Sequence, residues 1–372
     1  MEIIDKKYKI QSMQEINDLA WNGYNAVSTF SGCGGSSLGY KMANFKVLWA
    51  NEFIDAAREC YKANHKTTIL DGRDIRKVSG SDILNAVSLN VGEIDLFDGS
   101  PPCASFSTAG NREDDWGKVK KYSDKSQRTD DLFYEYARLI KETQPKVFVA
   151  ENVKGITMGV ATSMLGSFQD DMFDDQSSTI IRTLMACGYK VDFRVLNSIN
   201  YGVPQARQRT IFIGVRNDLG LLPKFPLQQN TYFTTNDSFA DLINSEEEIK
   251  ESQYNPTSKI YGMIKKLKEG ESGDTLPESN GSYFGLQRIR GDRPCPTICQ
   301  RQGNKGAGLV HPKEDRELTV SELKRLSSFP DDFILTGNYK RKCERIGRAV
   351  PPLLMKAIAK EIQESILMQI KK

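Results

Sequence analysis

One cysteine of this sequence lies in a setting that could make it a nucleophile. The segment DLFDGSPPCASFS, residues 95–107, runs from an apolar stretch into Pro101 and Pro102 and then Cys103. Prolines fix their own φ and restrict the residue before them, so they limit the directions in which the thiol can point. The thiolate is the reactive form, and it needs an electropositive, partly open environment. Most isolated cysteines are small buried residues, so chemistry here requires charged neighbours.

Two further segments supply such neighbours. The segment VFVAENVKG ends an apolar run in Glu151 and Asn152, a carboxylate and an amide. The segment YGVPQARQRTIFIGVR carries Arg207 and Arg209, which alternate on an extended run and therefore face the same side. A nearby arginine would lower the pKa of a thiol. Taken alone, Glu151 and Asn152 could equally cap a helix or hydrogen-bond the backbone of a loop. Arg207 and Arg209 could equally be charged residues that keep a solvated edge strand from pairing with another chain.

A glycine-rich turn favours a cofactor that contains a nucleoside. The segment FSGCGGSSLGY follows an apolar run and opens a helical pattern, where glycines admit a ligand and a helix N-terminus offers free N–H groups. Ser37 stands where the dinucleotide fingerprint needs its third glycine. Glu52 could bind ribose hydroxyls, Phe53 could stack on a base, and Asp74 could accept from an exocyclic amine. This set fits S-adenosylmethionine better than NAD.

The elements that must position these residues alternate along the first half of the chain. Strand-like runs are AVSTF, FKVLWA, EIDLF and KVFVA, and helical patterns are SSLGYKMA, FIDAARECYKAN and DDLFYEYARLIKET. In the last of these, one helix face collects Leu132, Phe133, Tyr136, Leu139 and Ile140, after an N-cap at Thr129 or Asp130. The alternation predicts an α/β fold with a parallel, doubly wound sheet, whose ligands bind beyond the carboxyl ends of the strands.

The length of 372 residues suits two domains. Residues 218–315 are polar and weakly periodic, which indicates a smaller domain of loops and short strands. LTVSELKRLSSFPDDF resembles a helix closed by Pro330, and the last segment is a helix with apolar residues spaced by four. We therefore expect a first domain of residues 1–217 plus 343–372, a second of residues 218–315, and a hinge of residues 316–342.

Composition restricts the remaining classes of function. The formal net charge of +3 neither requires nor excludes a nucleic-acid partner. Seven cysteines in a long chain without an evident secretion signal do not predict a disulfide framework. Cys295 and Cys299, with only His65 and His311 to join them, are too few for zinc, so no metal is expected. No apolar run could span a membrane, and we expect a cytoplasmic protein.

In this order, the segments resemble the C5-cytosine-specific DNA methyltransferases of bacterial and phage type, from about residue 26 to residue 360. FSGCGG, NEF and GRDI match the family's motifs for S-adenosylmethionine, and GSPPCASFS matches its Pro-Cys motif. ENV and QARQR match two further motifs. RPCPTICQRQG, LTVSELKRLSSFPDDF and IGRAVPP resemble the segments that frame the target-recognition domain and close the fold. Six motifs in order make the resemblance specific.

The resemblance implies a mechanism in which Cys103 adds to C6 of cytosine. Glu151 would bond to N3 and the exocyclic amine, and Arg207 or Arg209 would lie near the base carbonyl and the thiolate. The base would have to leave the duplex, and the loop 104–128 would close over it. The implied S-adenosylmethionine site comprises Phe30, Ser31, Gly32, Gly34, Gly35, Glu52, Phe53, Asp74, Ile75, Pro102, Leu132, Ala349 and Val350. The implied DNA contacts are Ser107, Arg293, Thr297 and Gln302.

The implied partners are double-stranded DNA, bound by a monomer with residues 218–315 as its target-recognition domain, and a cognate restriction endonuclease that acts separately. Arg348 and Ala104 depart from the family pattern, which usually has asparagine and a polar residue there. Three other functions remain as alternatives. An RNA methyltransferase would usually carry Cys-Phe-Thr after its cysteine motif, an inactive DNA-binding regulator need not keep Cys103 with Glu151, and an NAD-dependent oxidoreductase leaves the cysteine loop unexplained.

Overall fold

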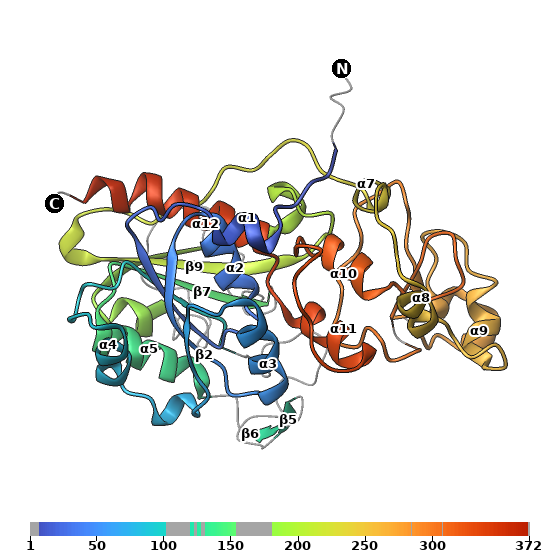
Figure 1. Ribbon diagram of the computed structural model, residues 1–372, viewed down its shortest axis with the longest axis horizontal. Coiled ribbons are helices and arrows are strands. Elements are labelled where there is room, and N and C mark those ends of the chain that lie inside the picture. Colours follow the sequence, from blue (N-terminus) through green and yellow to red (C-terminus); the bar gives the residue numbers. More distant parts are fainter. Residues whose placement is uncertain are drawn as a thin grey trace, which may run out of the picture.

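The computed structural model describes residues 7–101, 120–122, 125–127, 131–153, 181–283, 285–306 and 308–370, with the backbone alone for 120–122 and 125–127. Its helices are α1 (Met13–Asn17), α2 (Gly35–Met42), α3 (Asp55–Asn64), α4 (Gly80–Val87), α5 (Leu132–Thr143), α7 (Thr235–Phe239), α8 (Glu246–Ser252), α9 (Lys259–Ile264), α10 (Val320–Leu326), α11 (Tyr339–Arg348) and α12 (Pro352–Ser365), with helical residues also at 181–185. In Figure 1 the larger part of the chain surrounds a sheet, and a smaller part with α8 and α9 extends from one end.

Seven strands form the central sheet, in the order β3-β2-β1-β4-β7-β9-β8. They are β1 (Asn25–Thr29), β2 (Lys46–Asn51), β3 (Ile69–Asp71), β4 (Leu96–Gly99), β7 (Val147–Val153), β8 (Tyr189–Asn197) and β9 (Gln208–Arg216). The pairs from β3 to β7 are parallel, but β9 is antiparallel to both of its neighbours. The predicted α/β, doubly wound fold is confirmed, because the four strands predicted in the first half are parallel; β9, which follows the QARQR segment, adds an antiparallel strand.

The reversed strand follows from a short connection. β8 ends at Asn197 and β9 begins at Gln208, with the 3-10 turn η4 (Ser198–Tyr201) between them. Neighbouring parallel strands need a crossover of about a dozen residues or more, whereas a short turn is enough for antiparallel strands. As a result, β9 begins at the edge of the sheet where the parallel strands end.

Helices cover both faces of the sheet, as a doubly wound fold requires. α2 and α12 pack on one face, and α4 and α5 pack on the other. Successive strand residues serve opposite faces: Ala26 is buried against α2 and α12, and Val27 against the other helices. Leu96 and Phe97 of β4 repeat this alternation. The next residue, Asp98, therefore points its side chain toward α2.

The amphipathic helix predicted over residues 130–143 forms as α5. Its predicted core residues are all buried, namely Leu132, Phe133, Tyr136, Leu139 and Ile140. The N-cap is Asp131 rather than Thr129 or Asp130, which lie outside the described residues. The carboxylate of Asp131 does not cap the helix by a side-chain bond but accepts two hydrogen bonds from Arg76. Arg76 lies in the 3-10 helix η1 (Ile75–Lys77), so this pair fixes the start of α5.

A third hydrophobic cluster joins the sheet region to residues 316–342, the expected hinge. Leu38 of α2 and Cys60 of α3 are buried in it together with Leu323 of α10 and Ile346 of α11. The segment 316–342 therefore contributes to a shared core. Among the helices that the structure describes, none is both long and apolar enough to cross a membrane.

The helix predicted before Pro330 is shorter than expected. α10 ends at Leu326, and Ser328 then adopts a left-handed conformation with φ of 59°. This turn returns Phe329 and Phe333 to the third cluster, where their rings meet edge to face at 4.8 Å. Burial of two aromatic rings thus outweighs continuation of the helix.

Residues 218–315 are rich in loops, as expected, but their regular elements are helices more than strands. In the described part of this range, α7, α8 and α9 accompany the two-residue strands β10 (Gln287–Arg288) and β11 (Leu309–Val310), and the 3-10 helices η6 (Gly273–Thr275) and η7 (Pro277–Ser279). A small core contains Tyr254, Ile264, Leu267, Leu286 and Val310. Arg288 is only 6% exposed and donates to the carbonyls of Ile264 and Leu267, so its side chain holds the loops around this core.

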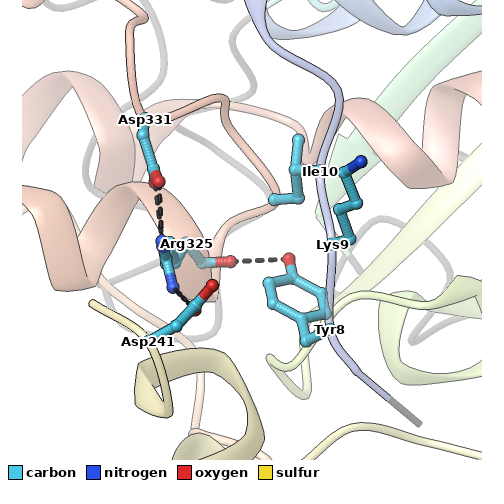
Figure 2. A pocket seen from close by; sticks show the side chains of 6 residues that line it. All are labelled: Tyr8, Lys9, Ile10, Asp241, Arg325 and Asp331. Atoms are coloured by element: carbon cyan, nitrogen blue, oxygen red, sulfur yellow. Dashed lines mark hydrogen bonds and ion pairs between the residues drawn. The ribbon is translucent and has the colours of Figure 1, made fainter.

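A cavity of about 210 Å³ marks the joint between the N-terminal segment, α7 and α10. Figure 2 shows Arg325 of α10 between Asp241 and Asp331, with which it forms ion pairs. The Tyr8 hydroxyl donates to the carbonyl of Arg325 at 2.8 Å. These contacts hold the N-terminal segment, the residues after α7 and α10 together. They do not include the candidate residues at the edge of the sheet.

Replacement of Ile358 by alanine should destabilise the fold. Ile358 of α12 is fully buried against the sheet, and the cavity left by the lost methylenes should lower the free energy of unfolding by about 2–5 kcal/mol in urea denaturation. The matched control is Ile243→Ala, because Ile243 is 91% exposed and its loss should change stability by less than about 0.5 kcal/mol. Equal losses in the two variants would contradict the assigned core.

Candidate active site

The predicted residues gather at one edge of the sheet. β1, β2, β4 and β7 run parallel and end there, and β9 begins there because it runs the other way. In the β7–β9 register, Glu151 is opposite Ile211 and Val153 is opposite Arg209. Of the residues predicted to act at this edge, Pro102, Cys103 and Ser107 lie outside the described residues. The side chains discussed below are those on either side of that segment.

The loop between β1 and α2 has a strained backbone. Phe30, Gly32 and Gly34 all have positive φ, at 53°, 57° and 96°. A left-handed conformation is uncommon for a bulky residue such as Phe30 and is typical of ligand-binding turns. The amide of Ser31 donates to the carbonyl of Asn51 at 3.0 Å, which ties the loop to the end of β2. Gly34 is the N-cap of α2 and makes no side-chain cap, so the start of this helix faces the loop.

Two glycines of this loop differ in what surrounds them. A Cβ at Gly32 would have no heavy atom within 4 Å, so there is open space beside it. A Cβ at Gly34 would lie 2.2 Å from Nε2 of His65, a buried ring at the end of α3. Burial holds the pKa of His65 well below its usual value, so this ring is neutral and acts as a wall behind the loop. Gly32 thus leaves room for a ligand, whereas Gly34 lets the loop close on the protein.

Glu52 braces the glycine loop from the end of β2. Its carboxylate accepts from the amide of Gly32 at 2.7 Å and from the amide of Ile54 at 2.7 Å. The side chain is buried, and burial raises its pKa above the usual value. Each carboxylate oxygen can accept a second hydrogen bond, so the predicted contact with ribose hydroxyls stays compatible with this bracing.

The other predicted cofactor residues fall into two groups. Phe53 and Asp74 are partly exposed, and Asp74 accepts from the amide of Arg76 at 3.1 Å. The side chains that are buried or partly buried in the hydrophobic clusters are those of Ile75, Leu132, Ala349 and Val350. Val350 lies beside the loop, because a Cβ at Gly35 would be 2.4 Å from its carbonyl oxygen. This second group shapes the site through packing.

The end of β7 carries the acidic group and its partner. Glu151 is about 10% exposed and forms an ion pair with Nε of Arg209 at 2.6 Å. The amide of the next residue, Asn152, donates to the carbonyl of Pro101 at 3.2 Å. The two residues predicted from the ENV motif therefore link β9 on one side to the start of the cysteine loop on the other.

Arg207 is a buried cation at the same edge. It is 3% exposed, and Nη1 donates to the carbonyl of Ile298 at 3.0 Å. Burial, together with the nearby charge of Arg209, lowers the pKa of Arg207 to about 9, although Glu151 acts in the opposite direction. Of the two predicted arginines, Arg209 thus contacts the predicted glutamate, and Arg207 lies near enough for the charge of Glu151 to affect its pKa.

The predicted DNA contacts are placed differently. Arg293 is exposed, and its carbonyl accepts from Thr235. The Thr297 hydroxyl donates to the carbonyl of Ala206 at 2.7 Å, beside the QARQR segment. Gln302 is 1% exposed, and its amide pairs with both the N–H and the carbonyl of Leu309. The polar atoms of Gln302 therefore hold a loop together in this fold, and its contact with DNA stays a prediction.

Sequence reasoning missed two buried groups at this edge. The sequence prediction gives no role to Asp98, which directly follows the expected strand EIDLF, although a carboxylate at the end of an apolar run is a visible signal. It treats His65 only as a possible metal ligand, and the position of His65 behind Gly34 depends on how α3 packs on α2. Burial raises the pKa of Cys33, within the glycine loop, to about 12, so its thiol is not a nucleophile.

The residues present fit S-adenosylmethionine. The open space at Gly32 would admit the ligand close to the backbone, and the first amides of α2 lie beside it. Glu52, which the sequence predicts to bind the ribose, bonds to Gly32 in this loop, and Phe53 and Asp74, predicted to contact the base, are partly exposed. No triphosphate-binding or pyrophosphate-binding pattern is needed, which agrees with the departure at Ser37 from the dinucleotide fingerprint.

Replacement of Gly34 by alanine should destabilise the ligand-free protein more than the same change at Gly32. The new Cβ at Gly34 must displace His65 and must also adopt φ of 96°, whereas at Gly32 without a ligand only the conformation is strained. We expect Gly34→Ala to lower the free energy of unfolding by about 1 kcal/mol or more beyond the loss in Gly32→Ala, measured by urea denaturation without the cofactor. An equal or larger loss for Gly32→Ala would contradict the assigned packing.

Comparison with known proteins identifies the family. The model of the C-5 cytosine-specific DNA methylase family matches residues 24–364. Type II methyltransferase M1.HphI of Haemophilus parahaemolyticus is 32% identical over 344 residues, which cover 90% of this chain and 86% of that protein. Type II methyltransferase M.Eco47II of Escherichia coli is 31% identical over 363 residues, which cover 92% and 79%.

Solved structures agree at the level of the fold. A prophage-encoded protein of Escherichia coli, assigned as a DNA modification methyltransferase, superposes with a TM-score of 0.70 at 21% identity, over 93% of this chain and 100% of that one. A mutant of DNMT2 from Spodoptera frugiperda has a TM-score of 0.65 at 15% identity, over 92% and 100%. Because the family model matches most of the chain, this chain belongs to the C-5 cytosine-specific DNA methylase family, enzymes that methylate cytosine in DNA with S-adenosylmethionine as the methyl donor.

Proposed function

We propose that this enzyme methylates C5 of a cytosine within a specific double-stranded DNA site, with Cys103 as its nucleophile. The observation that supports this most directly is the cluster at the edge of the sheet. The Glu151–Arg209 ion pair and buried Arg207 lie beside Asn152, which bonds to Pro101, two residues before Cys103. A thiol delivered to this edge would meet two cations and a carboxylate.

The mechanism begins with the thiolate of Cys103, which adds to C6 of the cytosine and moves the C5–C6 π electrons to C5. Glu151 would hydrogen-bond N3 and the exocyclic amine, and these bonds would offset the charge that develops in the ring. Arg207 and Arg209 would stabilise the thiolate and the base carbonyl. The bound cofactor supplies an electrophilic methyl group on a sulfonium. Loss of the C5 proton to a base then allows β-elimination, which breaks the C6–S bond and restores the thiolate.

The target cytosine must leave the duplex to reach the edge of the sheet. We assign residues 1–217 plus 343–372 to catalysis and cofactor binding, residues 218–315 to target recognition, and residues 316–342 to the connection between them. Arg293 and Thr297 are the candidates for DNA contact among the described residues, because Arg293 is exposed and Thr297 lies next to the QARQR segment. Ser107 and the loop 104–128 would close over the extrahelical base.

The cellular setting is part of the proposal. The similar proteins M1.HphI and M.Eco47II are named Type II methyltransferases, which supports a modification enzyme that protects DNA from a separate restriction endonuclease. We propose that it acts as a monomer in the cytoplasm. Parallel methylation assays on duplex DNA and on transfer RNA distinguish this function from RNA methylation by the same chemistry, and bisulfite-type sequencing of the methylated DNA would reveal the recognition site.

Replacement of Cys103 by serine should abolish methyl transfer to DNA while S-adenosylmethionine still binds. The serine hydroxyl is a far weaker nucleophile at neutral pH than a thiolate. Incorporation of labelled methyl groups into duplex DNA measures the first effect, and equilibrium dialysis of the cofactor measures the second. The control is Cys187→Ser, at a thiol buried beside α5, which should retain methyl transfer. Full activity of Cys103→Ser would rule out the assigned nucleophile.

DNA that contains 5-fluorocytosine at the target should trap the enzyme. Fluorine at C5 cannot leave as a proton does, so β-elimination stops and the S–C6 bond persists. Mass spectrometry of the digested complex should place the adduct on Cys103. An adduct on another residue, such as the exposed Cys299, would overturn the assignment.

A further inference from the structure

One of the buried carboxylates that the mechanism above leaves unused lies beside the cofactor loop. Asp98, the third residue of β4, is 1% exposed. One of its oxygens accepts from the Tyr40 hydroxyl at 2.8 Å, and the other accepts from the Ser28 hydroxyl at 2.8 Å. A buried carboxylate is costly unless it is paired or well hydrogen-bonded. Among the described residues, no cation pairs with Asp98 in the structure, so these two hydroxyls are its main support.

Both hydroxyls lie on the elements that flank the cofactor loop. Ser28 is in β1, directly before the loop, and Tyr40 is in α2, the helix that the loop opens. The Ser31 hydroxyl donates to the carbonyl of Ser28 at 3.0 Å and lies 3.2 Å from the Ser28 hydroxyl. The carboxylate of Asp98 therefore connects the two ends of the glycine loop, and Ser31 extends this network into the loop itself.

The backbone around Asp98 is fixed just as closely. The Thr29 hydroxyl donates to the carbonyl of Asp98 at 3.1 Å. A Cβ at the next residue, Gly99, would lie 2.4 Å from the ring of Tyr136 and 2.7 Å from the Thr29 hydroxyl. The chain then continues through Pro101 toward the cysteine loop. Asp98 is thus bonded to the cofactor loop by its side chain and lies in the strand that leads to the nucleophile.

We propose that Asp98 is a positioning residue that sets the glycine loop and the strand before Cys103 in one arrangement, and that its ionised form holds this arrangement best. An ionised carboxylate can accept from both hydroxyls at once, whereas the protonated acid must donate one hydrogen and forces one hydroxyl to turn. The proposal rests on the function given above, because it concerns the same cofactor loop and the same nucleophile.

The surroundings of Asp98 make this change possible near neutral pH. Burial raises the pKa of Asp98 to about 7, although the two hydroxyl donors lower it. The titratable groups that face it are Tyr40 on α2, Tyr61 on α3, Tyr136 on α5 and Glu151 on β7. Burial raises the pKa of all three tyrosines, so they remain neutral, and the charge of Glu151 favours the protonated acid.

The test measures the affinity of the full chain for S-adenosylmethionine without DNA, by equilibrium dialysis between pH 6 and pH 8. Because the ionised form holds the loop, wild-type affinity should rise as the pH increases through about 7. In Asp98→Asn the amide cannot ionise, so that part of the rise should disappear, and affinity at pH 8 should fall about tenfold with the loss of one charge-assisted hydrogen bond. If the affinity of Asp98→Asn rises with pH as steeply as that of the wild type, the proposal is overturned.

The matched control is Asp95→Asn. Asp95 is also buried, at 4% exposure, and precedes the same strand at its opposite end, where it pairs with Lys146 and accepts from the amide of Asn25. This variant should keep the wild-type slope, because its partners do not reach the cofactor loop. Loss of the slope in Asp95→Asn as well would reveal a general effect of stability and would overturn the positioning role.

A second variant decides the question if Asp98→Asn fails to fold. Tyr40→Phe keeps the ring in the core but removes one donor from the carboxylate, so the midpoint of the pH dependence should move upward. An unchanged midpoint would overturn the proposal. Trapping with 5-fluorocytosine DNA reports separately on Cys103: a normal adduct with an unchanged pH slope refutes the role of Asp98 alone, whereas an adduct elsewhere refutes the proposed function.

Discussion

The direction of β9 is the constraint on which the rest of the site depends. A carboxylate at the end of β7 and an arginine at the start of β9 can meet at one edge only if the two strands run in opposite directions. The Glu151–Arg209 ion pair at 2.6 Å is the result, and buried Arg207 lies beside it. If β9 were parallel to β7, the arginines would lie at the far edge, on the order of 25 Å away for a strand of this length. The short connection from β8 prevents that arrangement.

The arrangement of the site also depends on close contact between α2 and α12. A Cβ at Gly39 would lie 2.5 Å from the Cβ of Met355, and a Cβ at Gly35 would lie 2.4 Å from the carbonyl oxygen of Val350. Glycine is the residue that allows two helices to approach this far. The last segment of the chain therefore packs against the first loop, and the glycines of FSGCGGSSLGY serve this packing as well as the cofactor.

Burial gives the charges at this edge their chemical character. Desolvation lowers the pKa of Arg207 to about 9 and raises that of Asp98 to about 7, while it also raises the pKa of Glu52. For Asp98 and Glu52 the polar contacts that support the group are already made before a ligand arrives, whereas the buried Nε of Arg207 has no hydrogen-bond partner among the described residues. Such preorganised groups interact more strongly with a developing charge than solvated groups do, because no water has to reorganise.

The sequence by itself determined the order of strands and helices in the first half and the buried face of α5, and it grouped Glu151 with the two arginines; the place of Cys103 in this group stays a prediction. Local periodicity and motif spacing depend only on residues that are close in the sequence, so they can be recognised without a tertiary structure. Only the tertiary structure decided that β9 is antiparallel and that Gln302 is buried. It also decided that Asp98 bonds to Tyr40 and Ser28, which lie 58 and 70 residues away along the chain. Such contacts depend on how distant elements pack, and desolvation, which sets the charge of Asp98 and Arg207, exists only after that packing has formed.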